Sequence, residues 1–262
     1  MSHHHRDPIQ TQLPPGPLLR ALEWRAPYEW GMALAATPWL SVLPRGDGHP
    51  VLVLPGLTAS DLSTVLLRRV IGAQGYACHG WKLGVNRGPH PGVIEGCIER
   101  TVELHARQGR TVSLIGWSLG GLYAREVAKQ APGAVRQVIT LGTPFTGHPK
   151  ATNAWQLFER VSGQSVDDLA LRASLHEAPS VPTTSIWSRT DGVVSWQCSL
   201  ETPGASSENI EVDASHRGLG MNPAVLYAVL DRLAQPEGRW RPFRREGLRQ
   251  LVYPDPRRAG PN

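Results

Sequence analysis

The chain carries a serine whose neighbours suit nucleophilic chemistry. Residues 116–120 read GWSLG, which is the pattern G-x-S-x-G, directly after the predicted strand 111–115 and before a helical stretch. A strand-to-helix turn this tight strains its central residue and needs small neighbours. It holds the serine hydroxyl above the sheet edge, at the positive end of a helix dipole, where an oxyanion is favoured. Ser118 is therefore the predicted nucleophile; the alternative is a glycine-rich turn with an idle serine.

These residues resemble the α/β-hydrolase superfamily, specifically its bacterial serine esterases and lipases. The resemblance covers about residues 50–235 and rests on GWSLGG at 116–121, VLPGL at 53–57 and LGTP at 141–144. In lipases of this family the last of these turns is often followed by His and Gly, whereas Phe-Thr-Gly follows here. The resemblance implies the α/β-hydrolase fold and a catalytic role for Ser118.

A hydroxyl nucleophile also needs a general base, which an acidic residue orients. In this fold the three groups occur along the chain in the order Ser, acid, His. Three histidines follow Ser118, and two of them, His148 and His176, precede the strand expected to carry the acid. The order leaves His216, in a loop before the last predicted helix, as the base. The alternative for His216 is an ordinary core or surface histidine.

The acid is predicted from its place after the penultimate strand. Asp191 follows the predicted strand 183–187, where the fold carries its acid, whereas Asp213 is only three residues from His216. Asp191 is therefore the predicted acid. Because Asp-Gly is a common turn pair, a plain turn at Asp191-Gly192 is the alternative.

Two backbone N–H groups are expected to stabilise the oxyanion. One belongs to Leu119, directly after the nucleophile, and the other to the loop after the first core strand. In that loop Pro55 has no N–H group, and Leu57 is favoured over Gly56 as the second donor.

Residues 145–182 form the longest insertion between predicted core strands and are expected to cover the serine. Trp155 and Phe158 in this insertion, and Trp117 beside the nucleophile, are the predicted substrate-binding side chains. The apolar residues of the insertion would line an acyl pocket, although their helical spacing also fits plain packing against the core. These residues are Trp155, Leu157, Phe158, Val161, Leu169, Leu171 and Leu175.

Apolar runs alternating with helical stretches predict a mostly parallel sheet with helices on both faces and a small helical cap, an α/β class fold. The predicted strands are residues 51–54, 75–82, 111–115, 135–141, 183–187 and 209–212. The predicted helices are residues 18–43, 61–71, 94–108, 119–130, 153–177 and 224–234, with Ser60 and Asp61 at the start of the second. Three parts are expected: an N-terminal segment packed on the core (1–49), the catalytic domain (50–235, with 145–182 as its cap) and a basic C-terminal tail (236–262).

Charge and composition bound the partners. The net charge is +5, and residues 236–262 hold seven arginines against three acidic residues, so the basicity belongs to the tail and does not predict nucleic-acid binding. Arginines among aromatic residues there would allow weak contact with a membrane surface, and a solvated terminal segment is the alternative. No cofactor or metal motif is expected. Three cysteines, no signal peptide and no apolar run long enough to span a bilayer favour a cytoplasmic protein.

The predicted function is therefore hydrolysis of a small carboxylic ester with a hydrophobic acyl group, through an acyl-enzyme on a Ser-His-Asp triad and without a cofactor. The same triad can pass the acyl group to an alcohol or an amine, which would make the chain an acyltransferase or amidase. A non-catalytic binding protein on the same scaffold is the remaining alternative, because fold alone does not establish activity.

Overall fold

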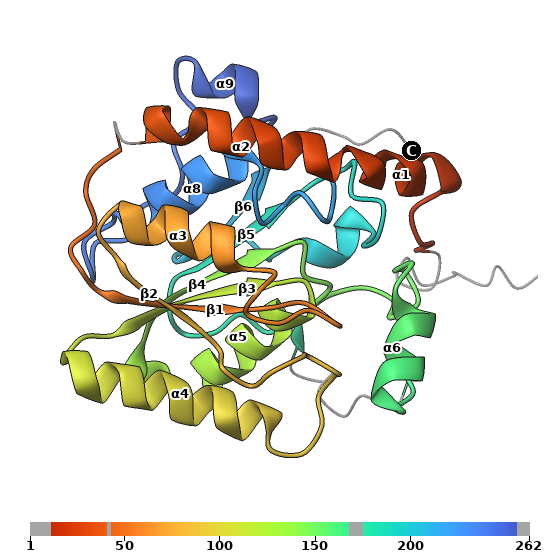
Figure 1. The fold of residues 1–262 in the computed structure, drawn as a ribbon, viewed down its shortest axis with the longest axis horizontal. Coiled ribbons are helices and arrows are strands. Elements are labelled where there is room, and N and C mark those ends of the chain that lie inside the picture. The colour runs from red at the N-terminus through yellow and green to blue at the C-terminus, as the bar shows by residue number, and fades with distance from the viewer. Residues whose placement is uncertain (1–11, 41–42, 168–174, 256–262) are drawn as a thin grey trace, which may run out of the picture.

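The computed structural model describes residues 12–40, 43–167 and 175–255 of the chain. Six strands of this part form one sheet in the order β2-β1-β3-β4-β5-β6, and every neighbouring pair is parallel (Figure 1). They are β1 (Pro50–Leu54), β2 (Ala77–Gly80), β3 (Val112–Trp117), β4 (Val135–Leu141), β5 (Thr183–Trp187) and β6 (Ser207–Glu211). The predicted parallel sheet is confirmed.

Helices cover both faces of this sheet (Figure 1). After residue 25 the described helices are α2 (Ala26–Leu40), α3 (Val65–Ala73), α4 (Val93–Gln108), α5 (Leu119–Gln130), α6 (Trp155–Ser162), α8 (Pro223–Leu233) and α9 (Arg249–Val252). Alternate residues of β1 point to opposite faces: Val51 and Val53 pack with α2, α3 and α8, whereas Leu52 and Leu54 pack with α4 and α5. The continuous apolar run of β1 is thus explained by burial on both sides.

The start of α3 differs from the sequence prediction. The helix begins at Val65, and Asp61 does not cap it. Instead the Asp61 carboxylate accepts hydrogen bonds from the backbone N–H groups of Trp81, at 2.9 Å, and Lys82, at 3.1 Å. A Cβ on Gly80 would lie 2.2 Å from Asp61 Oδ1, so the glycine lets the carboxylate reach the turn after β2. A long-range partner replaces the expected local one.

The N-terminal segment, residues 17–40, consists of α1 (Pro17–Leu22), the 3₁₀ turn η2 (Glu23–Arg25) and α2, and it packs on α8. Unlike an ordinary surface helix, this segment buries its acidic side chains and exposes aromatic ones. Both of its acidic residues, Glu23 and Glu29, are buried, whereas Trp24 is 85% and Tyr28 69% exposed. Because buried carboxylates need partners, the rest of the molecule must supply donors to this segment.

The described part of the C-terminal tail packs against the body of the protein. The rings of Phe243 and Tyr253 lie 4.7 Å apart between centroids, and Tyr253 is buried with the α8 side of the core. The buried Glu208 of β6 accepts hydrogen bonds from Arg232, at 2.8 Å, and from the backbone N–H of Phe243, at 2.6 Å. The division into three parts stays a prediction.

A buried ion pair ties the helix after β3 to the segments around it. Arg125 of α5 pairs with Glu201, and both side chains are fully buried. The guanidinium also donates to the carbonyl oxygens of Leu175, at 3.2 Å, and Glu177, at 2.9 Å, and lies 3.9 Å from the ring centroid of Phe145. Arg125 therefore fixes residues 175–177 of the 145–182 insertion against α5.

Replacing Arg125 tests this anchor. Arg125→Ala leaves Glu201 buried without its charged partner, and breaking such a pair costs about 3–5 kcal/mol. Urea unfolding should report a loss of that size. Arg107→Ala, which removes an exposed pair with Glu103, should cost less than about 1 kcal/mol. Equal losses for the two variants would contradict an anchoring role for Arg125.

Candidate active site

Ser118 occupies the turn between β3 and α5 in a strained backbone conformation, with φ 54° and ψ −122°. A non-glycine residue at positive φ is uncommon and persists only where the surroundings fix it. Here the Ser118 N–H donates to the carbonyl of Leu141 at the end of β4, at 2.8 Å. The neighbouring strand thus holds the backbone of the turn.

Close packing behind Ser118 explains the glycines of the turn. A Cβ on Gly120 would lie 2.3 Å from the carbonyl oxygen of Leu54 in β1, and one on Gly121 would lie 2.0 Å from Thr143 Oγ1. Since no side chain fits at these distances, α5 can start this close to β1 and β4 only with glycine at both positions. The G-x-S-x-G-G run is therefore dictated by tertiary packing as well as by local strain.

Asp191 and His216 meet at the same edge of the sheet, in the loops after β5 and β6. His216 Nδ1 lies 2.7 Å from Asp191 Oδ2, and both side chains are buried. The other carboxylate oxygen, Asp191 Oδ1, accepts from the N–H groups of Val193 and Val194, both at 2.8 Å. Because a carboxylate only accepts, a neutral His216 carries its proton on Nδ1 and leaves Nε2 as an acceptor.

Ser118 lies beside this pair. The turn N–H bonds to Leu141, and the next residue, Gly142, lies so close to the pair that a Cβ on it would be 3.1 Å from both Asp191 Oδ2 and His216 Nδ1. Within the described residues, neither Ser118 Oγ nor His216 Nε2 forms a hydrogen bond. Such contacts are often long without substrate and tighten in the complex.

The environment of His216 shifts its basicity. Burial lowers the pKa of the imidazole, but the charge and hydrogen bond of Asp191 and the charge of Glu23 raise it, against a lowering by Arg217. The net result is a pKa for His216 above the ordinary histidine value. His216 is therefore a stronger base than a solvated histidine, and it is neutral only at a correspondingly higher pH.

The loop after β1 lies against the serine. A Cβ on Gly56 would lie 3.2 Å from Ser118 Cβ. Asn86, from the loop after β2, fixes the loop after β1. Its side-chain amide donates to the Pro55 carbonyl at 2.9 Å, and its backbone carbonyl accepts from the Thr58 N–H at 2.7 Å. The sequence does not reveal this role of Asn86, since an isolated asparagine carries no signal of it. Among the described residues, the N–H groups of Leu57 and Leu119 have no hydrogen-bond acceptor.

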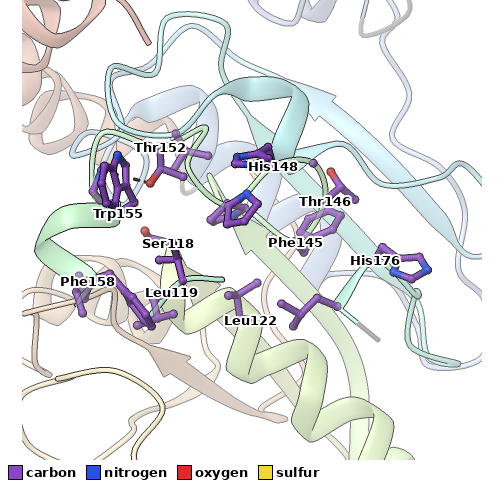
Figure 2. A pocket seen from close by; sticks show the side chains of 18 residues that line it. Ser118, Leu119, Leu122, Phe145, Thr146, His148, Thr152, Trp155, Phe158 and His176 are labelled. Atoms are coloured by element: carbon purple, nitrogen blue, oxygen red, sulfur yellow. Dashed lines mark hydrogen bonds between the residues drawn. The ribbon is translucent and has the colours of Figure 1, made fainter. Parts of the chain in front are cut away.

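A mostly apolar cavity of about 290 Å³ opens above Ser118. Figure 2 shows the Ser118 hydroxyl on its floor, with Trp155 on one side and Phe145 on the other. Leu57 and Leu119 also line it, as do Leu122, Phe158, Val166 and Leu175, and the polar rim includes Thr146, His148, Thr152 and His176. Leu169 and Leu171 lie outside the described residues.

Trp117 has a different place from the one expected. Its indole N–H donates to the carbonyl of His216, at 3.1 Å, and its ring packs against Gly220 and the core on the α8 side. Trp155 and Phe158 line the cavity, whereas Trp117 is absent from its described lining. Trp117 therefore supports the histidine loop from behind.

Two further observations concern metal binding and membrane insertion. Among the residues described, no cluster of three His, Cys, Asp or Glu side chains suits a metal ion. Nor does any described helix combine the length and apolarity needed to cross a membrane.

Solved structures resemble the chain at low sequence identity. Aspergillus fumigatus lipase B is 18% identical over 75% of this chain with a TM-score of 0.56, and the chain spans 55% of that lipase. A metagenome-derived lipolytic enzyme is 16% identical over 73% of this chain and 96% of its own, with a TM-score of 0.57. An α/β-superfamily hydrolase from Oenococcus oeni is 17% identical over 72% of this chain and 94% of its own, with a TM-score of 0.53. No protein-family model and no curated protein matches the sequence. The likeness shows a shared fold.

The raised pKa of His216 is testable without a substrate. Asp191→Asn removes the charge that favours imidazolium, so the pKa of His216 should fall by about one to three units. NMR titration of the ring C–H signal, assigned with His216→Gln, measures this. Asp213→Asn, an exposed carboxylate in the same loop as His216, is the control and should leave the pKa within a few tenths of a unit. An unshifted pKa in Asp191→Asn would refute the coupling.

Proposed function

We propose that the chain is a cofactor-independent serine hydrolase that cleaves carboxylic esters. Its α/β-hydrolase fold supports this proposal. The observation that carries the proposal is the buried Asp191–His216 hydrogen bond beside a strained serine on the floor of an apolar cavity. Ser118 is the proposed nucleophile, His216 the general base and Asp191 the residue that orients it. An idle scaffold would have no need of a buried carboxylate against a buried imidazole.

In the first half of the reaction, His216 Nε2 takes the proton of Ser118 Oγ while this oxygen bonds to the acyl carbon. The oxyanion is held by the N–H groups of Leu57 and Leu119, two residues that line the cavity and whose N–H groups have no acceptor within the described part of the chain. Losing one such donor costs about 2.7–4 kcal/mol of transition-state stabilisation. His216 then gives its proton to the leaving alcohol as the ester C–O bond breaks, and an acyl-enzyme remains.

In the second half, His216 takes a proton from water, whose oxygen attacks the acyl carbon. The carboxylic acid leaves as the proton returns to Ser118 Oγ, which restores the free enzyme. An alcohol or an amine in place of this water would give an acyl transfer by the same steps.

The cavity favours a hydrophobic acyl group. Its lining is mostly apolar and includes four leucines, and Trp155 and Phe158 of α6 lie at one wall. Each methylene transferred from water to such a wall gains about 0.8 kcal/mol. A small ester with an aliphatic acyl chain is therefore the proposed substrate. Contact of the basic tail with a membrane surface and a cytoplasmic location stay predictions.

Ser118→Ala tests the proposed nucleophile. Turnover of p-nitrophenyl esters from acetate to palmitate should fall at least about a thousandfold, because the covalent step is lost. A fluorophosphonate probe should label the wild type and Ser63→Ala, a serine in an exposed turn, but not Ser118→Ala. Labelling of Ser118 without ester turnover would redirect the assay to alcohol and amine acceptors. Absence of labelling would refute the proposal.

Trp155→Ala tests the proposed acyl pocket. Removing the indole should lower kcat/KM for octanoate about tenfold relative to acetate, because only the longer chain reaches this wall. The matched control is Leu157→Ala on the same helix, whose side chain is 43% exposed and outside the described cavity lining. An unchanged octanoate-to-acetate ratio in Trp155→Ala would show that the acyl chain binds elsewhere.

A further inference from the structure

The N-terminal segment reaches both loops that carry the proposed acid and base. Glu23 of η2 is buried, and its Oε1 accepts the N–H of Gly192 and the N–H of His216, each at 2.8 Å. Its Oε2 accepts the N–H of Arg217 at 3.1 Å. One carboxylate from outside the sheet thus joins the residue after Asp191 to His216 itself.

The fit of this contact is tight. A Cβ on Gly192 would lie 2.2 Å from the carbonyl oxygen of Leu19 and 2.8 Å from Glu23 Cγ. The acid loop therefore lies directly against the N-terminal segment and needs glycine there. Because one oxygen atom accepts from both loops, the separation of their backbones is fixed at the point where Asp191 meets His216.

Glu29 of the same segment provides a natural contrast. It accepts from the N–H of Ser215, at 2.9 Å, and from its hydroxyl, at 2.6 Å, and it pairs with Arg25 at 3.2 Å. Among the described residues, its hydrogen bonds go to the histidine loop and none reaches the loop of Asp191. Glu29 is thus as buried as Glu23 and on the same helical segment, yet it does not join the two loops.

We propose that Glu23 is a positioning residue that sets the alignment of Asp191 and His216, so that the N-terminal segment forms part of the catalytic apparatus. The inference rests on the proposed function, since it concerns the same triad. Glu23 touches neither substrate nor reacting atoms; it acts through the backbones of the two loops and through its charge beside His216.

The charge of Glu23 gives this role a signature that a merely structural residue lacks. The charged groups that act most strongly on His216 are Asp191 from the loop after β5, Glu23 from η2 and Arg217 from its own loop, and Asp191 and Glu23 both raise its pKa. The Arg25–Glu29 pair lies on the same N-terminal segment but is not among them. Removing the Glu23 charge should therefore lower the pKa of His216, whereas removing the Glu29 charge should not.

Glu23→Gln and Glu29→Gln form the matched pair of variants. Glutamine at position 23 keeps an acceptor oxygen for Gly192 and His216 but removes the charge. In Glu23→Gln the pKa of His216 measured by NMR should fall by about half a unit or more. The apparent pKa of the acid limb in the pH profile of kcat/KM for p-nitrophenyl esters should fall by about the same amount. In Glu29→Gln both should stay within about 0.2 unit of the wild type. Glu23→Ala, which removes the link, should lower kcat about tenfold or more with KM changed less than twofold.

An unshifted His216 pKa in a folded Glu23→Gln, or equal shifts in the two glutamine variants, would overturn the inference. A stability loss in Glu23→Ala with an unchanged kcat and pH profile would overturn it too. Because the NMR titration needs no turnover, it tests the charge coupling even if the proposed function fails. If Glu23→Gln does not fold, Glu23→Asp replaces it: the retained charge should hold the pKa near the wild-type value while the shorter side chain lowers kcat severalfold. An unchanged kcat in Glu23→Asp would overturn the alignment role.

Discussion

The Asp191–His216 hydrogen bond depends on two strands that run parallel and side by side. β5 and β6 pair in register from Thr183 with Ser207 to Trp187 with Glu211, and Val212 extends the pairing by donating to the Trp187 carbonyl. Parallel neighbours end at the same edge of a sheet, so their following loops start next to each other. Side chains 25 residues apart in the chain thereby come within 2.7 Å. An antiparallel arrangement of the same two strands would put these loops at opposite edges.

The same edge receives the serine turn, and the packing there explains why its strain persists. Ser118 keeps its positive φ because β4 accepts its N–H and because Gly120 and Gly121 let α5 press against β1 and Thr143. Asn86 closes the arrangement by fixing the loop after β1, which lies against Ser118. The loops after β1, β3, β4 and β5 thus meet around one cavity. Backbone hydrogen bonds hold each of these loops, in addition to side-chain contacts.

The N-terminal segment adds a contact from outside the sheet. It carries two acidic residues that both point inward: Glu23 accepts from backbone N–H groups of the loops after β5 and β6, and Glu29 from the loop after β6. Hydrogen bonds from N–H groups to a charged acceptor are worth about 1.5–3 kcal/mol each. This gain offsets the desolvation of the carboxylates and explains why the segment exposes Trp24 and Tyr28 while it buries acids.

Local pattern determined the strands of the sheet and the helix after β3. Local sequence predicts three elements to the residue: the strands 135–141 and 183–187 and the helix 119–130. Consecutive residues carry the signals for a buried strand and for the turns that end it. The order of residue types also singled out Ser118, Asp191 and His216 as the candidates. Tertiary structure alone decided which partner each side chain takes. Asp61 bonds to the turn after β2 instead of capping α3, and Trp117 supports the histidine loop. Asn86 and Glu23 hold the loops around the serine. These partners are far apart in the chain, and they meet because the parallel strands end at one edge of the sheet and the N-terminal segment packs on α8 beside it.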